Sequence, residues 1–118
     1  MKHMNHTTQT RNVLIFAGSD PSCGAGLQAD ALTVNALGAH PLTVVTTLTV
    51  QDHNRVYAAH AVAPDLVIAQ AHALIQNLPI HAVKIGALGS ADNASFVANL
   101  LQNLRKTQPN LPIILDPV

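Results

Sequence analysis

Glycines and small polar residues are concentrated in one stretch of the sequence, residues 18–26, which reads GSDPSCGAG. Gly24 and Gly26 would let the backbone approach a ligand closely. A helix that begins directly afterwards would add free N–H groups and the positive end of its dipole, which favour an anion such as phosphate. The spacing fits neither standard phosphate-binding motif, because Ala29 stands where G-x-G-x-x-G needs glycine and no Gly-Lys-Ser/Thr follows. A phosphate site and a plain tight turn both remain open.

Asp116 and the histidines are the other residues whose types suit chemistry. Asp116 follows an apolar run and precedes a proline, so it suits either a metal ion or a turn. The seven histidines show no spacing typical of a metal site, and we assign them no role. Cys23 is the single cysteine, which excludes an internal disulfide and a zinc site built from several cysteines.

The apolar pattern along the chain alternates between strand and helix. Continuous or Val/Thr-rich runs predict strands over residues 12–17, 40–50, 55–62, 83–85 and 111–115. Helical spacing predicts helices that start at Leu27, at Pro64 and after a cap at Ser90 or Asp92. Leu37, Leu66, Leu78 and Phe96 are expected on the core-facing sides of these helices, with Pro79 ending the second. The alternation predicts an α/β fold with a mostly parallel, doubly wound sheet.

Such a sheet binds ligands beyond the carboxyl ends of its strands. The loop 18–26, the turn 51–54, the segment 86–89 and Asp116 would all lie at that edge. No helix follows the strand over 111–115, although a parallel sheet needs both faces covered, so the sequence is expected to be interrupted there.

The composition limits the class of protein. The chain has 118 residues, enough for one domain, with 48% hydrophobic and 10% charged residues, which excludes intrinsic disorder. Six Lys and Arg balance six Asp, and this neutral total gives no reason to expect nucleic acid or a membrane as partner. Residues 1–11 are polar and are expected to form a flexible arm before a domain over 12–118. No secretory signal or membrane-spanning run is present, so we expect a cytoplasmic protein.

The string over residues 17–30, AGSDPSCGAGLQAD, resembles the opening signature of the hydroxymethylpyrimidine/phosphomethylpyrimidine kinases of thiamin biosynthesis. These enzymes belong to the ribokinase-like superfamily. This string departs from the family pattern at two positions only: it has Cys23 where the family has glycine and Leu27 where the family has isoleucine. The blocks ALGAH, TVVTTLTVQD, VKIGALG and ILDPV follow in order at the family's spacing. The resemblance covers residues 12–118 and implies a ribokinase-like sheet that is incomplete at its C-terminal end.

The resemblance implies that the first loop holds a pyrimidine rather than ATP. It puts Gly18 and Ala25 against the ring, Asp30 on the polar edge of the ring, and Gln51 on the ring nitrogens or amino group. Val118 would line the pocket, and Ala87 would stand where the family usually has a methionine that packs on the ring. Asp116 would lie near Mg²⁺ and the ATP phosphates. A carboxylate and an amide can pair with the donors and acceptors of an aminopyrimidine edge. Without the resemblance, Asp30 would equally suit an exposed helix position and Gln51 a strand-end cap.

The resemblance also implies the reaction, which is ATP-dependent phosphorylation of 4-amino-5-hydroxymethyl-2-methylpyrimidine and then of its monophosphate. It covers roughly the first half of such a kinase, so the anion hole and the catalytic residue would lie beyond Val118. These 118 residues are therefore expected to be inactive alone, and the full-length form to be a homodimer. The alternatives are a non-catalytic pyrimidine-binding fragment, a poorly folded remnant, and a relative of pyridoxal or pyridoxine kinase.

Overall fold

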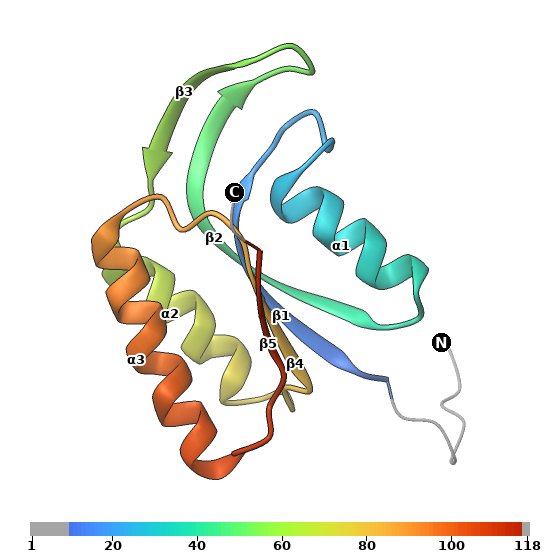
Figure 1. The fold of residues 1–118 in the computed structure, drawn as a ribbon, viewed down its shortest axis with the longest axis vertical. Helices are drawn as coiled ribbons and strands as arrows, with labels where there is room; N and C mark the ends of the chain where they lie inside the picture. Colours follow the sequence, from blue (N-terminus) through green and yellow to red (C-terminus); the bar gives the residue numbers. More distant parts are fainter. Residues whose placement is uncertain (1–9, 117–118) are drawn as a thin grey trace.

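A five-stranded sheet flanked by three helices makes up the described part of the chain (Figure 1). The computed structural model describes residues 10–116. The strands are β1 (Asn12–Ser19), β2 (His40–Gln51), β3 (Val56–Ala61), β4 (Ala82–Ile85) and β5 (Ile113–Leu115). The helices are α1 (Gly26–Ala36), α2 (Pro64–Ile75) and α3 (Ala91–Thr107).

The strands lie in the order β3-β2-β1-β4-β5. β1 pairs in parallel with β2 and β4, and β4 pairs in parallel with β5. β3 returns antiparallel along the end of β2 and forms an edge of the sheet. The structure therefore confirms the predicted α/β fold with a mostly parallel sheet.

The helices divide between the two faces of the sheet. α2 and α3 pack side by side on one face, whereas α1 lies alone on the other, against β1 and β2 (Figure 1). The first face holds the larger core, which includes Leu14, Phe16, Val44, Val67 and Val97. A smaller core under α1 consists of Ile15, Ala17 and Leu27. Successive β1 residues serve opposite cores because strand side chains alternate between faces.

Two helix starts follow the sequence prediction. Pro64 is the first residue of α2, where its missing N–H has no intrahelical partner to lose. Ser90 rather than Asp92 is the N-cap of α3, and its Oγ accepts a hydrogen bond from the Asn93 N–H at 3.0 Å.

The predicted core-facing positions were wrong for several residues. Leu37, Leu66, Leu78 and Phe96 are all exposed. Leu66 and Phe96 each precede a buried valine by one residue, so the turn of the helix carries them away from the core. Leu37 lies just past the end of α1, and Leu78 lies past the end of α2 at Ile75, before the expected stop at Pro79.

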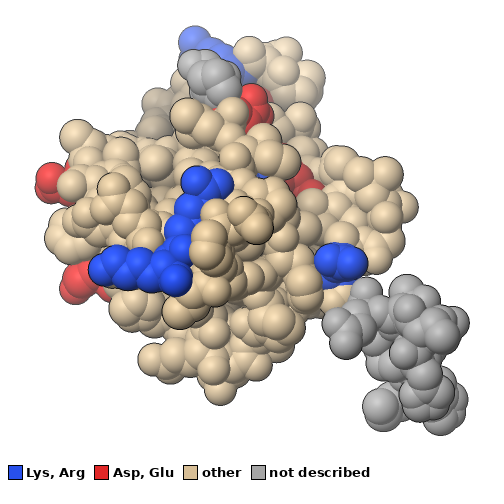
Figure 2. All heavy atoms as spheres, turned by 60° about the horizontal axis from the view of Figure 1, so that its bottom comes forward, with Lys and Arg blue, Asp and Glu red and all other residues tan. Residues whose placement is uncertain are grey.

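Charged side chains cover little of the molecular face drawn in Figure 2, in keeping with 10% charged residues in the chain. Within residues 10–116, no helix is both long enough and apolar enough to cross a membrane. Residues 1–9 of the predicted arm and Val118 lie outside the described residues. Arg11, the last residue of that arm, accepts a hydrogen bond from the His40 N–H through its carbonyl at 2.8 Å.

Candidate functional site

A pocket of about 490 Å³ lies at the carboxyl ends of β1, β2 and β4. The predicted site residues within the described part of the chain all line it: Gly18, Ala25, Asp30, Gln51, Ala87 and Asp116. They come from the loop after β1, from α1, from the end of β2, and from the segments after β4 and β5. The fold therefore brings together residues that are far apart in sequence, while Val118 lies outside the described residues.

The glycine-rich loop closes around the carboxylate of Asp20. That carboxylate accepts hydrogen bonds from the Ser22 N–H at 2.9 Å, the Ser22 hydroxyl at 2.7 Å, the Gly24 N–H at 3.1 Å and the Ala25 N–H at 2.9 Å. The bond from the Ser22 hydroxyl, helped by those from the backbone amides, lowers the pKa of Asp20 against the opposing effect of desolvation. A phosphate would need these amides and would meet a carboxylate there, which favours a turn over a phosphate cradle.

Gln28 of α1 holds this loop to the end of β1. Its Oε1 accepts from the Asp20 N–H and its Nε2 donates to Ser19 Oγ, both at 2.8 Å. Gly26 has φ +64, and a Cβ there would lie 2.5 Å from the Gly18 carbonyl oxygen, so only glycine fits. Cys23 also has positive φ, at 61, the left-handed conformation that favours the glycine of the family pattern.

The wall formed by β2 presents Thr47, Thr49 and Gln51 to the pocket. Thr49 Oγ1 donates to the Ser19 carbonyl at 2.6 Å, and Gln51 Nε2 donates to Thr49 Oγ1 at 2.7 Å. This chain of hydrogen bonds fixes the Gln51 amide beside the pocket rather than at the backbone of the strand end.

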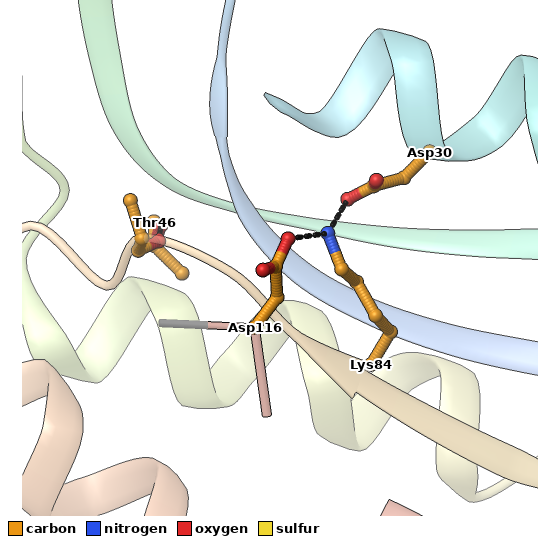
Figure 3. Close-up of polar contacts among 5 residues, drawn as sticks. Asp30, Thr46, Lys84 and Asp116 are labelled. Carbon is orange, nitrogen blue, oxygen red and sulfur yellow. Dashed lines mark hydrogen bonds and ion pairs between the residues drawn. The ribbon is translucent and has the colours of Figure 1, made fainter. Parts of the chain in front are cut away.

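Lys84 of β4 joins two acidic residues across the opposite wall (Figure 3). Its Nζ donates to Asp30 Oδ2 of α1 at 2.7 Å and lies 3.4 Å from Asp116 Oδ2, just beyond β5. The side chains of Lys84 and Asp30 are 22% and 20% exposed, whereas that of Asp116 is 61% exposed. Burial alone would lower the pKa of Lys84, but the hydrogen bonds and charges of Asp30 and Asp116 outweigh it and raise the pKa. Lys84 is therefore charged at neutral pH.

Lys84 was not among the site residues predicted from the sequence. Val83 and Ile85 on either side of it are buried in the larger core, so strand alternation turns Lys84 to the other face. The sequence did carry one signal for Lys84, because it is a single charged residue within an apolar strand. A charged side chain that is partly buried needs a partner of opposite charge.

Asn93 and Thr46 hold the pocket segment that contains Ala87. Thr46 Oγ1 donates to the Ala87 carbonyl at 2.6 Å. The fully buried Asn93 donates through Nδ2 to the carbonyls of Thr46 at 3.2 Å, Val62 at 3.0 Å and Leu88 at 2.9 Å. These bonds tie β2, the end of β3 and the segment after β4 to the start of α3.

Asp116 could supply only one carboxylate to a metal ion. Among residues 10–116 no group of three or more His, Cys or Asp side chains is placed to hold a metal. Mg²⁺ commonly binds through one or two carboxylates, with phosphate oxygens and water completing its shell. The exposed Asp116 fits that mode with a nucleotide present, and its 3.4 Å contact to Lys84 would compete with the ion.

Comparisons with known proteins agree with this architecture. A family model described as Phosphomethylpyrimidine kinase matches residues 20–118. The hydroxymethylpyrimidine/phosphomethylpyrimidine kinase of Escherichia coli (strain K12) is 42% identical over 107 residues, covering 91% of this chain and 39% of that protein. The crystal structure of phosphomethylpyrimidine kinase from Clostridium difficile 630 has 34% identity and a TM-score of 0.77, covering 91% of this chain and 48% of that chain. Pyridoxal kinase from Staphylococcus aureus in complex with pyridoxal has 25% identity and a TM-score of 0.79, covering 94% and 40%.

The fold is thus the ribokinase-like fold of phosphomethylpyrimidine kinase and pyridoxal kinase. Because the family model matches most of its length, the chain belongs to the phosphomethylpyrimidine kinase family. It spans 39% of the E. coli relative and 48% of the C. difficile structure, so it corresponds to less than half of each.

Proposed function

We propose that these residues form the pyrimidine-binding half of a kinase in thiamin biosynthesis. The reaction is ATP-dependent phosphorylation of 4-amino-5-hydroxymethyl-2-methylpyrimidine and then of its monophosphate. The observation that carries the proposal is that Gly18, Ala25, Asp30, Gln51 and Ala87 line one pocket together, although they come from separate segments of a chain of this family.

Each lining residue has a chemical reason for its proposed role. The amide of Gln51 offers both a donor and an acceptor, and the carboxylate of Asp30 offers acceptors, which suits a ring edge with an amino group and nitrogens. Gly18, Ala25 and Ala87 present backbone and small side chains, so a flat ring can lie close to them. Val118 would complete this lining.

ATP and Mg²⁺ are the co-substrate and ion of the proposed reaction. Asp116 would give Mg²⁺ one carboxylate at the open side of the pocket, where its side chain is 61% exposed. Phosphoryl transfer depends on positioning and on stabilising charge, and these residues correspond to 39% of the E. coli relative. We therefore expect these 118 residues to bind a pyrimidine without transferring phosphate at a useful rate.

A cytoplasmic location and a homodimer of the full-length form are further parts of the proposal. The use of ATP as co-substrate suits a cytoplasmic location. Size-exclusion chromatography with light scattering of a full-length form would test the second, and a purely monomeric mass would contradict it.

Calorimetric titration of the 118-residue chain with the hydroxymethylpyrimidine tests the binding role. We expect saturable binding that Gln51→Leu weakens by about tenfold, because the variant removes the amide that pairs with the ring. Gln102→Leu on the exposed side of α3 is the matched control and should leave binding unchanged. A chain that unfolds cooperatively but does not bind the pyrimidine would contradict the proposal.

Labelled ATP tests the expectation of inactivity in the same samples. ATP-dependent formation of the monophosphate by the 118-residue chain would overturn that expectation while supporting the substrate assignment.

Pyridoxal is the second candidate substrate, because the chain superposes on a pyridoxal kinase structure with a TM-score of 0.79. The two substrates separate in a competition titration. If pyridoxal displaces the pyrimidine at lower concentration than the pyrimidine displaces pyridoxal, the pyridoxal assignment is the better one.

A further inference from the structure

Lys84 is the only positively charged residue that lines the pocket within the described part of the chain. It enters from β4 and meets Asp30 of α1 and Asp116 beyond β5. Three separate elements therefore converge on one ammonium group at the pocket wall (Figure 3).

The two contacts of Lys84 differ in strength. The contact with Asp30 is a 2.7 Å charge-assisted hydrogen bond between two mostly buried groups. The contact with Asp116 is 3.4 Å long, and Asp116 is 61% exposed, so water competes for it. An ammonium group has three N–H donors. Lys84 can thus keep Asp30 and still donate to an acceptor that enters the pocket.

The charges that line the pocket indicate what the Lys84 ammonium group does there. Asp20, Asp30 and Asp116 all line the pocket. Hydrogen bonds from the loop hold Asp20, whereas Asp30 and Asp116 face Lys84. Without the lysine, two carboxylates would repel a phosphate monoester. A neutral alcohol would not be repelled in this way.

We propose that Lys84 determines whether the pocket accepts the phosphorylated form of its substrate. It does so by donating to the phosphate of the monoester and by cancelling the charge of Asp30 and Asp116. The inference rests on the proposed function, since it concerns the second of two substrates of the same site. The recognised chemistry is a ring-bearing phosphate monoester, and the neutral hydroxymethyl compound does not need this cation.

The test measures binding of both pyrimidines to the 118-residue chain and to Lys84→Met, which keeps the length of the side chain but not its charge. We expect the variant to lose about tenfold more affinity for the monophosphate than for the alcohol. Lys106→Met removes an exposed lysine of α3 and serves as the matched control, with no change in the ratio of the two affinities. An unchanged ratio in Lys84→Met would overturn the inference.

A second variant guards against misfolding of the first. Lys84→Met leaves Asp30 without its partner, so the double variant Lys84→Met/Asp30→Asn removes both charges of that pair and should restore cooperative unfolding. It still lacks the donor, and we expect it to keep the altered ratio of the two affinities, because loss of the Asp30 carboxylate at the ring edge affects both pyrimidines alike. Lys84→Arg keeps the charge and should recover part of the affinity for the monophosphate. If the double variant has the same ratio of the two affinities as the unaltered chain, the inference is wrong.

Salt provides an independent readout. Binding of the monophosphate to the unaltered chain should weaken as ionic strength rises, and this dependence should be reduced in Lys84→Met. If the unaltered chain binds neither pyrimidine, the proposed function itself fails. If it binds both and Lys84→Met alters both equally, only the role of Lys84 fails.

Discussion

The two faces of the sheet hold different kinds of interaction. On the face covered by α2 and α3, apolar side chains fill a continuous core, with Leu14, Phe16 and Val83 fully buried. On the face covered by α1, the core is small, and hydrogen bonds and ion pairs surround a pocket. The first face accounts for most of the apolar burial that stabilises the fold, and the second presents polar groups to a ligand. Because β1 and β4 have side chains on both faces, one set of strands performs both tasks.

Phe16→Ala should give the largest effect, since it removes a fully buried ring from the larger core. We expect it to lower the free energy of unfolding by about 3–5 kcal/mol, a large share of a typical domain's stability. Ile15→Val changes the neighbouring residue on the α1 face and should cost about 0.5–1.5 kcal/mol. Urea denaturation measures both. A loss well below about 3 kcal/mol for Phe16→Ala would contradict the close packing of this ring in the larger core.

Asn93→Asp should be the next largest change. The carboxylate would face the carbonyls of Thr46, Val62 and Leu88 in place of the amide that now donates to them. We expect a loss of about 3 kcal/mol, because buried acceptors lose their donor and a buried charge gains no partner. Asn99→Asp on the exposed side of α3 is the control and should change stability by less than about 0.5 kcal/mol. A similar loss of stability in both variants would show that the hydrogen bonds of Asn93 do not link these segments.

Asp20→Asn should affect the pocket more than the core. The variant loses the charge that holds the amides of Gly24 and Ala25, so the loop loosens and pyrimidine binding weakens. Because folding lowers the pKa of Asp20, its contribution to stability is present above the ordinary value of 3.8 and is lost as the pH falls through the lower folded-state pKa.

Thermal unfolding between pH 2 and pH 6 checks the sign of this effect. We expect the melting temperature of the unaltered chain to fall more steeply on acidification than that of Asp20→Asn. Parallel curves for the unaltered chain and Asp20→Asn would contradict the account.

Cys23→Gly should give the smallest effect, and a stabilising one. Relief of the left-handed conformation at φ 61 is offset in part by the greater freedom of glycine in the unfolded chain. We expect a gain of up to about 1 kcal/mol by urea denaturation. Cys23→Ser retains a Cβ and should give no gain, and a loss of stability in the glycine variant would show that the loop does not carry this strain.

Local patterns predicted the elements well, because apolar runs, Pro64 and Ser90 are signals carried by neighbouring residues. The strand pattern predicted that the loop 18–26, the turn 51–54, the segment 86–89 and Asp116 lie at the ligand-binding edge, and the resemblance to a family added Asp30 and the roles of the individual residues. Two features escaped prediction because they depend on tertiary contacts. Lys84 finds its partners only when α1 and the end of β5 approach β4. In the sequence Asp20 is typical of a turn, and only the folded loop brings the amides of Gly24 and Ala25 to its carboxylate.

Chemical-shift mapping of backbone amides tests the central contrast between the two faces most directly. The ¹⁵N-labelled 118-residue chain is titrated with 4-amino-5-hydroxymethyl-2-methylpyrimidine. We predict that the shifted amides cluster at Gly18, Ala25, Asp30, Gln51 and Ala87, while those along α2 and the C-terminal half of α3 stay unchanged. Shifts concentrated on α2 and α3, or no shifts in a folded chain, would contradict the assignment of ligand binding to the α1 side.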